Sequence, residues 1–351
     1  GARLLALRAG AALVQRYVRE QGRPDVVHAH GALLGGCVAV RAAPRLLAPV
    51  VLTEHSSVLL RGLASAGEAR LVRDALRRSD ALLAVGGRLR EALASHAPGR
   101  RIEVLGNPVD GTFFAPPTVP PAGLPFRFCS VGYLRPIKGF DRLIDAFALA
   151  FGGQDVRLAM AGDGPLRAAL AARALALGVG GQVDLVGQLP RDGVRDLLQG
   201  SHAFALASQV ETFGVALVEA MACGLPVVAT RCGGPEDIVE PLSGLLVEPD
   251  DTPALAEALA DMRQRRASFD ADAIRRRCLE RYAEGVIVDR LEEVYREVIA
   301  RGPAGGGRSH PVAEPHPDTL DGFGPAVLGQ DLHRGRGIGP QRQTLDPAAL
   351  A

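Results

Sequence analysis

The sequence lacks an excess of charge of either sign. Forty Lys and Arg residues are balanced by thirty-nine Asp and Glu residues, which leaves a formal net charge of +1. Because no overall field attracts a polyanion, we expect no nucleic-acid partner. The basic runs MRQRR and IRRRC near residues 262–278 would allow a weak peripheral membrane contact, but a solvated helix face is the interpretation that we favour.

Cysteines and long apolar runs are also scarce. The five cysteines are odd in number, scattered and without CxxC spacing, so neither a disulfide framework nor a zinc site is predicted. No apolar run reaches the ~18–20 residues that span a bilayer, and no signal peptide is evident. Together these absences predict a cytoplasmic protein with reduced thiols.

An initiating methionine is missing, and no predicted strand precedes the first helical stretch, GARLLALRAGAALVQRYVREQ. This beginning indicates a chain that is truncated at its start. A GxGxxG motif that follows a strand, with an acidic residue about twenty positions later, is missing as well. Its absence argues against a dinucleotide-dependent dehydrogenase.

Short apolar runs alternate with helical stretches in two arrays, the first over residues 25–110 and the second from Phe126 to about residue 230. Such short runs between helical stretches are typical of buried parallel strands in βαβ units. We therefore predict an α/β fold with two Rossmann-like, doubly wound parallel-sheet domains, the first of them incomplete.

Five prolines within residues 113–125 mark the boundary between the two domains. The last segment is rich in Gly and Pro, which is typical of disorder. We predict an N-terminal domain at residues 1–115, a Pro-rich linker at 116–125 and a C-terminal domain at 126–283. A helix at 284–301 is expected to pack back toward the N-terminal domain, and residues 302–351 form the disordered tail.

The stretch SQVETFGVALVEAMACGLPVVAT, residues 208–230, is the most informative. A predicted strand ends near Ser208, Gly214 opens a helix, and Gly224 closes it. The free N–H groups and the positive dipole end of such a helix start can bind an anion. Gly214 would also allow a ligand to approach the backbone closely.

Glu211 lies in the loop before this helix, and Glu219 lies near its second turn. As isolated residues they would be interpreted as a helix-entry charge and a solvated helix position. Glu219, however, falls within the apolar run VALVEAMA, where an unpaired charge is costly. We therefore favour a site in which the two carboxylates border one ligand and accept hydrogen bonds from its hydroxyls.

A second strand–loop–helix unit, SVGYLRPIKGFDRLIDAF, covers residues 130–147. Gly132 is expected to let the loop turn tightly, and Lys138 and Gly139 stand just before the helix. A lysine here could neutralise a diphosphate leaving group without a metal ion. A lone lysine after a strand is usually solvated, but two anion-binding loops in one domain favour a functional role.

His28 and His30 alternate on a predicted strand and therefore share one face. Two histidines on one face could suggest a metal site, but no third ligand with suitable spacing is visible. We therefore predict a structural role for both, and no metal.

Several motifs occur together in one order: GxxxxxKG at 132–139, AGDGP at 161–165, Glu211-x7-Glu219 with its continuation EAMACGLPVVAT, and TRCGGPEDIV at 230–239. In this order and spacing they resemble the retaining GT-B glycosyltransferases of family four, also called glycosyl transferases group 1. The resemblance covers roughly residues 25–300. It implies two domains that face a cleft and the transfer of a sugar from a nucleoside diphosphate sugar to an acceptor hydroxyl.

Taken position by position, the resemblance implies that Lys138 binds the donor diphosphate and that Gly214 with Val215 forms the phosphate-binding helix start. Glu219 is similar to the family's ribose ligand, and Glu211 to the residue that contacts hydroxyls of the transferred sugar. His55, just after a strand, matches a histidine that faces the cleft near that sugar.

The remaining implied donor-binding residues are Gly132, Phe213 and Arg135. Many family members have an arginine directly after the first loop glycine, where this chain has Tyr133. We assign Arg135, two positions further on, to the donor site, and do not predict a two-cation clamp. Asn107 and Asp110 resemble the family's interdomain turn and are expected to shape that loop.

The resemblance thus implies catalytic roles for Lys138, Glu211 and His55, and no cofactor besides the nucleotide sugar as co-substrate. The donor would be a UDP- or GDP-sugar, and the acceptor a carbohydrate or lipid-linked molecule in polysaccharide, glycolipid or glycoconjugate synthesis. Two alternatives remain, namely a nucleotide-sugar epimerase of the same fold and a fragment that binds the donor without turnover.

Overall fold

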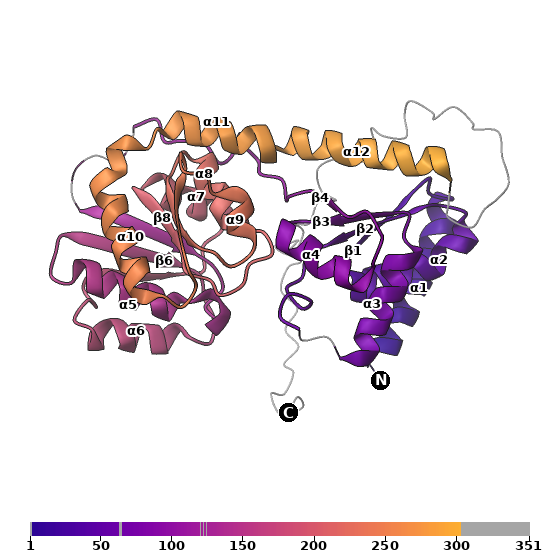
Figure 1. The fold of residues 1–351 in the computed structure, drawn as a ribbon, viewed down its shortest axis with the longest axis horizontal. Coiled ribbons are helices and arrows are strands. Elements are labelled where there is room, and N and C mark those ends of the chain that lie inside the picture. The colour runs from indigo at the N-terminus through magenta and orange to yellow at the C-terminus, as the bar shows by residue number, and fades with distance from the viewer. Residues whose placement is uncertain (1, 63–64, 120, 122, 124, 303–351) are drawn as a thin grey trace, which may run out of the picture. The chain divides into compact units, whose positions relative to one another are not determined.

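The computed structural model describes residues 2–62, 65–119, 121, 123 and 125–302 (Figure 1). The predicted tail, apart from Gly302, lies outside these described residues. Two parallel sheets organise the described chain, so the prediction of an α/β fold with two parallel sheets is confirmed.

The first sheet has four strands in the order β1-β2-β3-β4. Its strands are β1 (Val27–His30), β2 (Val50–Glu54), β3 (Ala81–Ala84) and β4 (Glu103–Val104). The helical segments beside it are α1 (Ala2–Gln21), the π-helical η1 (Gly31–Gly36), α2 (Cys37–Leu46), α3 (Ala66–Arg78) and α4 (Gly87–His96). All residues of β2 are buried, the apolar Val50–Leu52 as well as the polar Thr53 and Glu54.

The second sheet has six strands in the order β10-β9-β8-β5-β6-β7. They are β5 (Phe126–Val131), β6 (Val156–Ala161), β7 (Val183–Gly187), β8 (Ala203–Leu206), β9 (Val227–Thr230) and β10 (Gly244–Val247). The chain enters at β5, adds β6 and β7 on one side, and then returns to add β8, β9 and β10 on the other. The strand order therefore reverses between β5 and β8, and ligands of doubly wound sheets bind at the carboxyl ends of the strands beside such a reversal.

Helices cover both faces of the second sheet (Figure 1). On one side lie α5 (Phe140–Phe151), α6 (Arg167–Ala176) and α10 (Thr252–Arg265), and on the other lie α7 (Arg191–Gln199), α8 (Val215–Ala222), the short α9 (Gly234–Ile238) and α11 (Ala271–Tyr282). Two faces follow from right-handed crossovers that run in opposite directions from β5. The core between these layers is built from apolar side chains that are fully buried, among them Phe128, Phe147, Phe151 and Phe204.

Two local features of the first array differ from the sequence-based expectation. The strand predicted within residues 101–110 is reduced to the two residues of β4. The stretch after β1 begins as the π-helical η1 before it continues as α2. A side chain at Gly36 would meet Leu52 Cδ1 at 2.5 Å, so this glycine lets the helical segment pack closely on β2.

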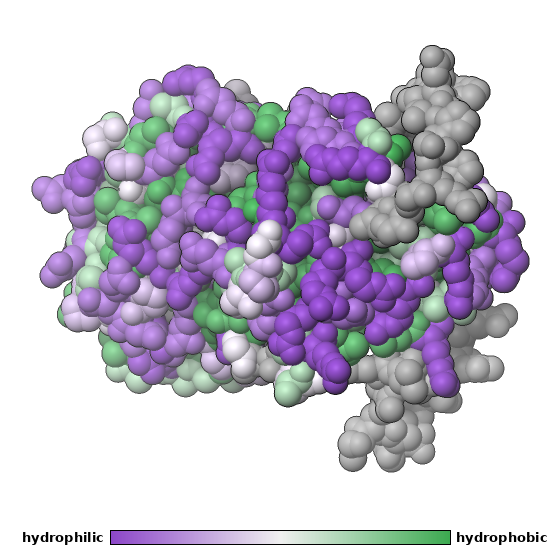
Figure 2. Space-filling model, turned by 45° about the vertical axis from the view of Figure 1, so that its right-hand side comes forward, coloured by the Kyte–Doolittle hydropathy of each residue, from purple (hydrophilic) through white to green (hydrophobic). Residues whose placement is uncertain are grey.

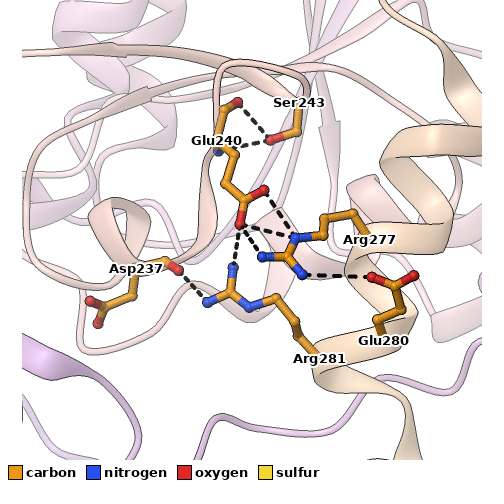
Figure 3. Close-up of polar contacts among 6 residues, drawn as sticks. All are labelled: Asp237, Glu240, Ser243, Arg277, Glu280 and Arg281. Atoms are coloured by element: carbon orange, nitrogen blue, oxygen red, sulfur yellow. Dashed lines mark hydrogen bonds and ion pairs between the residues drawn. The ribbon is translucent and has the colours of Figure 1, made fainter.

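An arginine network holds α11 against the turn after α9 (Figure 3). Arg277 donates to both carboxylate oxygens of Glu240, with Nη2 at 2.8 Å from Oε1. Arg281 donates to the same carboxylate and to the Asp237 carbonyl at 2.6 Å. The hydrogen bonds from Arg277 hold the pKa of Glu240 below its usual range.

Most of the other arginines of residues 262–278 also make contacts within the protein. Arg275 donates to the carbonyls of Gly111, Phe114 and Ala222. Further internal partners are contacted by Arg263, Arg265 and Arg266. Most side chains of this basic run therefore have partners within the protein, and the weak membrane contact considered from the sequence stays a prediction.

Hydrophilic residues cover most of the face shown in Figure 2, with smaller hydrophobic areas between them. Within the described part of the chain, no helix combines the length and apolar character needed to cross a bilayer.

The last described helix, α12 (Glu284–Arg301), contacts the first sheet. Arg290 pairs with Glu103 through two hydrogen bonds of 2.5 and 2.7 Å. Farther along α12, the Tyr295 hydroxyl lies 2.6 Å from His28 Nδ1 on β1. Leu291, Val294 and Val298 are buried, so apolar packing as well as polar contacts fixes this helix.

Candidate functional site

The loop after β5 positions Lys138 at the point where the strand order reverses. Residues Pro136–Lys138 form a single 3-10 turn, and Gly139 follows with a φ of 64°. A side chain at Gly139 would come within 2.0 Å of the Ala207 carbonyl oxygen, which follows β8. The loop after β5 is thereby packed against the loop after β8.

Gly139 is therefore a sensitive position, and replacing it with alanine is expected to lower the free energy of unfolding by about 1–3 kcal/mol. The new methyl group would combine a left-handed backbone with a steric overlap. Urea unfolding is the measurement. Gly153→Ala is the matched control, because Gly153 has a φ of 76° but no atom within 4 Å of the added carbon. Equal losses in the two variants would contradict the close packing at Gly139.

Lys138 and Glu211 are brought into direct contact. Lys138 Nζ lies 2.5 Å from Glu211 Oε1, and the exposed fractions of the two side chains are 23% and 11%. Ser208 Oγ donates to the same carboxylate oxygen at 2.8 Å. Sequence reasoning assigned Lys138 and Glu211 to one ligand but predicted neither their ion pair nor the contribution of Ser208, whose signal was a polar residue at a strand end.

The start of α8 leaves backbone donors free. Gly214 has a φ of 108° and offers no side-chain cap. The N–H groups of Leu217 and Val218 donate to the Gly214 carbonyl, whereas those of Val215 and Ala216, in the first turn, have no helical acceptor. The positive end of the helix dipole and these two donors together can bind an anion.

Glu219 lies on α8, half-buried. Burial raises its pKa to about 7, an effect that Arg191 partly opposes. Among the described residues its carboxylate makes no hydrogen bond or ion pair. A half-buried carboxylate without a partner is a free acceptor, consistent with a ligand that would supply hydroxyl donors.

Glycines of the other motifs shape the same loops. Gly162 has a φ of 142°, and a side chain there would meet the Gly132 carbonyl oxygen at 1.9 Å. Gly233 has a φ of 126°, and a side chain there would meet the Glu211 carbonyl oxygen at 2.3 Å. The chain bends at Gly132 without a left-handed backbone, and Gly139 is the glycine of this loop that has a positive φ.

Two further predicted donor-binding residues, Phe213 and Arg135, differ in their exposure. The Phe213 ring is buried and packs edge-on against Tyr282, with ring centroids 5.3 Å apart. A donor could therefore meet Phe213 only through its backbone. The Arg135 side chain is exposed, and the described residues supply it with no hydrogen bond or ion pair. Its role stays a prediction.

His55 belongs to the first sheet, where it follows β2. Its Nε2 lies 2.8 Å from His30 Nδ1, a pairing that the sequence did not indicate. The buried Glu54 carboxylate accepts from the His55 N–H at 2.9 Å and from the Ala32 N–H at 2.7 Å, and so joins the loop after β2 to η1. The described residues contain no group of three or more His, Cys, Asp or Glu placed to hold a metal ion.

The segment that leaves the first sheet is shaped by Asp110. Its Oδ1 accepts from the Thr112 N–H at 3.1 Å and from the Phe113 N–H at 2.9 Å, as in an Asx turn. Its other oxygen lies 3.2 Å from Arg191 Nη2, and that guanidinium sits 4.2 Å from the centre of the Phe113 ring. This geometry fits the loop-shaping role expected for Asp110.

Comparisons with known proteins extend over both sheets. The sequence family described as Glycosyltransferase Family 4 matches residues 2–113, and Glycosyl transferases group 1 matches residues 120–277. The chain is 32% identical over 334 residues to D-inositol 3-phosphate glycosyltransferase 1 of Catenulispora acidiphila, which covers 84% of this chain and 76% of that protein.

Solved structures share the fold. Sucrose-phosphate synthase from Thermosynechococcus elongatus matches with a TM-score of 0.71 and 23% identity, over 83% of this chain and 77% of that one. Anabaena HepE, solved in complex with UDP-glucose, matches with a TM-score of 0.70 and 22% identity, over 82% of each chain. The chain thus belongs to the family-four, or group 1, glycosyltransferases, enzymes of GT-B fold that transfer a sugar from a nucleotide-sugar donor.

Proposed function

We propose that this glycosyltransferase acts with retention of anomeric configuration, moves its sugar from a UDP- or GDP-sugar to the hydroxyl of a carbohydrate or lipid-linked acceptor, and needs no metal ion. One observation carries the proposal. Lys138, the only lysine of the chain, and the free N–H groups of α8 lie in the loops after β5 and β8, the neighbouring strands at which the strand order reverses.

Lys138 and the α8 start supply the charge that the reaction needs. As the bond between the sugar and the diphosphate lengthens, negative charge grows on the leaving group and positive charge grows on the sugar ring. A preorganised ammonium group and two backbone donors stabilise the first of these charges. Glu211, held in place by Ser208 and Lys138, would accept hydrogen bonds from the transferred sugar.

Glu219 would hold the ribose of the donor. Its carboxylate, which makes no hydrogen bond to the described residues, lies about one turn along α8 from the proposed diphosphate contacts at Val215 and Ala216. Both carboxylates therefore serve binding, rather than the acid and nucleophile roles of a glycosidase.

The absence of a metal requirement is directly testable. Turnover and donor binding are expected to be unchanged in excess EDTA, because Lys138 and the α8 dipole offset the diphosphate charge. Initial rates with and without EDTA, and again after addition of Mg²⁺ or Mn²⁺, measure this. Loss of activity in EDTA that Mg²⁺ or Mn²⁺ restores would contradict the electrostatic account.

The donor can be identified by a binding screen. HepE was solved with UDP-glucose, which supports testing UDP-sugars first and GDP-sugars second. Thermal shift and calorimetry, with the Lys138→Ala and Glu219→Ala variants beside the wild type, would rank the donors. A labelled donor then separates the outcomes: transfer to an acceptor supports the proposal, whereas an isomerised sugar without transfer, or binding without turnover, would overturn it.

A further inference from the structure

The end of the first sheet that carries His55 is linked to α12 by a chain of side chains. His28 on β1 makes two hydrogen bonds with its ring: Nδ1 lies 2.6 Å from the Tyr295 hydroxyl, and Nε2 lies 2.7 Å from Thr53 Oγ1. Thr53 is buried on β2. Both ring nitrogens of His28 are thus engaged, one by each neighbour.

The chain continues from His28 to the His55 side chain. The rings of His28 and His30 lie 4.3 Å apart between centroids, with 36° between their planes. His30 Nδ1 in turn lies 2.8 Å from His55 Nε2, and the ring centroids of His30 and His55 are 5.1 Å apart. The His28 ring therefore packs against the His30 ring, which in turn contacts His55.

The charge state of this array restricts its hydrogen bonding. Burial, together with His30 and His55 nearby, lowers the pKa of His28 to about 3, so His28 is neutral near pH 7. A neutral imidazole donates from one nitrogen and accepts at the other. A phenol is a stronger donor than an aliphatic alcohol, so we assign the Tyr295 O–H as donor to Nδ1 and the His28 Nε2–H as donor to Thr53.

We propose that Tyr295 is a positioning residue for the reaction: by fixing the tautomer and ring orientation of His28, it holds the His30–His55 pair in place. This inference rests on the proposed function, in which His55 faces the transferred sugar. It assigns α12 a part in the chemistry of the first sheet, in addition to its packing.

The Tyr295 hydroxyl can be removed without disturbing the packing of α12. The position of α12 is fixed by the Arg290–Glu103 pair and by the buried Leu291, Val294 and Val298, none of which depends on the Tyr295 hydroxyl. Tyr295→Phe keeps the ring and deletes one hydrogen bond. Tyr17→Phe is the matched control, because Tyr17 is 50% exposed on α1.

The test uses the whole chain and two readouts. Histidine ring ¹⁵N chemical shifts, assigned with single His→Gln variants, are expected to change at His28 and also at His30 and His55 in Tyr295→Phe. In the same variant kcat is expected to fall about 3–10-fold, while the KM for the donor and the melting temperature stay close to the wild-type values. Tyr17→Phe should alter none of these quantities.

The outcomes separate this inference from the proposed function. Shifts confined to His28, or an unchanged kcat in Tyr295→Phe, would overturn the positioning role. If the wild type binds donors but transfers no sugar, the proposed function fails, and the NMR arm alone then decides whether Tyr295 orders the histidine pair. A Thr53→Val variant adds a check, because its effect and that of Tyr295→Phe should be less than additive if both act through His28.

Discussion

Replacing Lys138 with alanine is expected to lower kcat by about 10²–10³-fold, the range seen when one preorganised transition-state donor is lost. The reason is the place of this ammonium group, which lies 2.5 Å from Glu211 in the loop after β5, while α8 follows the neighbouring strand β8. Without it, only the helix start would face the charge that develops on the diphosphate. Steady-state and single-turnover rates measure the change.

Two further variants sharpen this test. Lys138→Arg restores the charge but replaces a compact ammonium by a planar fork, so we expect it to recover only part of the lost rate. Arg173→Ala is the control with the same change in net charge, since Arg173 pairs with Asp145 on α5 and is assigned no role in the site. If Lys138→Ala kept kcat within about threefold of the wild-type value, the assignment would be contradicted. The loss of a single neutral hydrogen bond can lower a rate by more than that.

The single lysine also provides a spectroscopic check. Reductive ¹³C-methylation would label only Lys138 Nζ and the chain's amino terminus, because every other basic side chain besides histidine is an arginine. Binding of UDP or GDP should shift the Lys138 resonance, since the ammonium would then face a phosphate group as well as Glu211. An unchanged resonance at saturating nucleotide would place the diphosphate elsewhere.

Replacing Glu219 with glutamine is expected to weaken donor binding and to remove its pH dependence. Because burial raises the Glu219 pKa to about 7, the carboxylate form dominates only above that pH. Ribose hydroxyls donate best to the ionised form, so affinity for the nucleotide should rise by up to about tenfold from pH 6 to pH 8. The variant should show a flat, weaker profile in calorimetry.

The same substitution should stabilise the ligand-free protein at alkaline pH. A carboxyl whose pKa is raised on folding contributes stability at low pH that is lost as the pH rises to about 7, because the folded state binds the proton more tightly. Glutamine removes that loss, so Glu219→Gln should gain on the order of 1–3 kcal/mol over the wild type at pH 8 and less at pH 5.

Glu257→Gln, at an exposed position of α10, is the control for both effects of the Glu219 substitution. A flat wild-type binding profile between pH 6 and pH 8 would contradict the role of Glu219. So would a Glu219→Gln variant that binds as tightly as the wild type at pH 8.

The sequence predicted a donor site with Lys138 and Glu211 beside the second sheet, but not the contact that these two side chains make. Lys138 and Glu211 are recognisable because each follows an apolar strand and precedes a glycine-bearing helix start. Their ion pair forms because β5 and β8 are neighbours in the sheet. The spacing of apolar residues does not predict the order of the strands.

The surroundings of Phe213 and the pairing of His30 with His55 could not be predicted from the sequence for a similar reason. The buried state of Phe213 depends on Tyr282 of α11, which is distant in the sequence. In the first sheet, the pairing of His30 with His55 follows from the register that sets His30 opposite Thr53. Periodicity predicts that a strand exists, whereas register and packing are decided by residues elsewhere in the chain.

Arg275 compensates the dipole of α8 at the C-terminal end of that helix. Its guanidinium binds the Ala222 carbonyl at the last residue of that helix, as well as the carbonyls of Gly111 and Phe114. The negative pole of α8 is thus neutralised by a cation of the protein itself, while the first turn at the positive pole contains no acidic residue. Arg275 and the start of α8 are separated by the length of that helix, about 12 Å at a rise of 1.5 Å for each residue. Replacing Arg275 with a neutral residue would therefore weaken the positive field that an anion meets at Gly214, although Arg275 itself does not contact the anion.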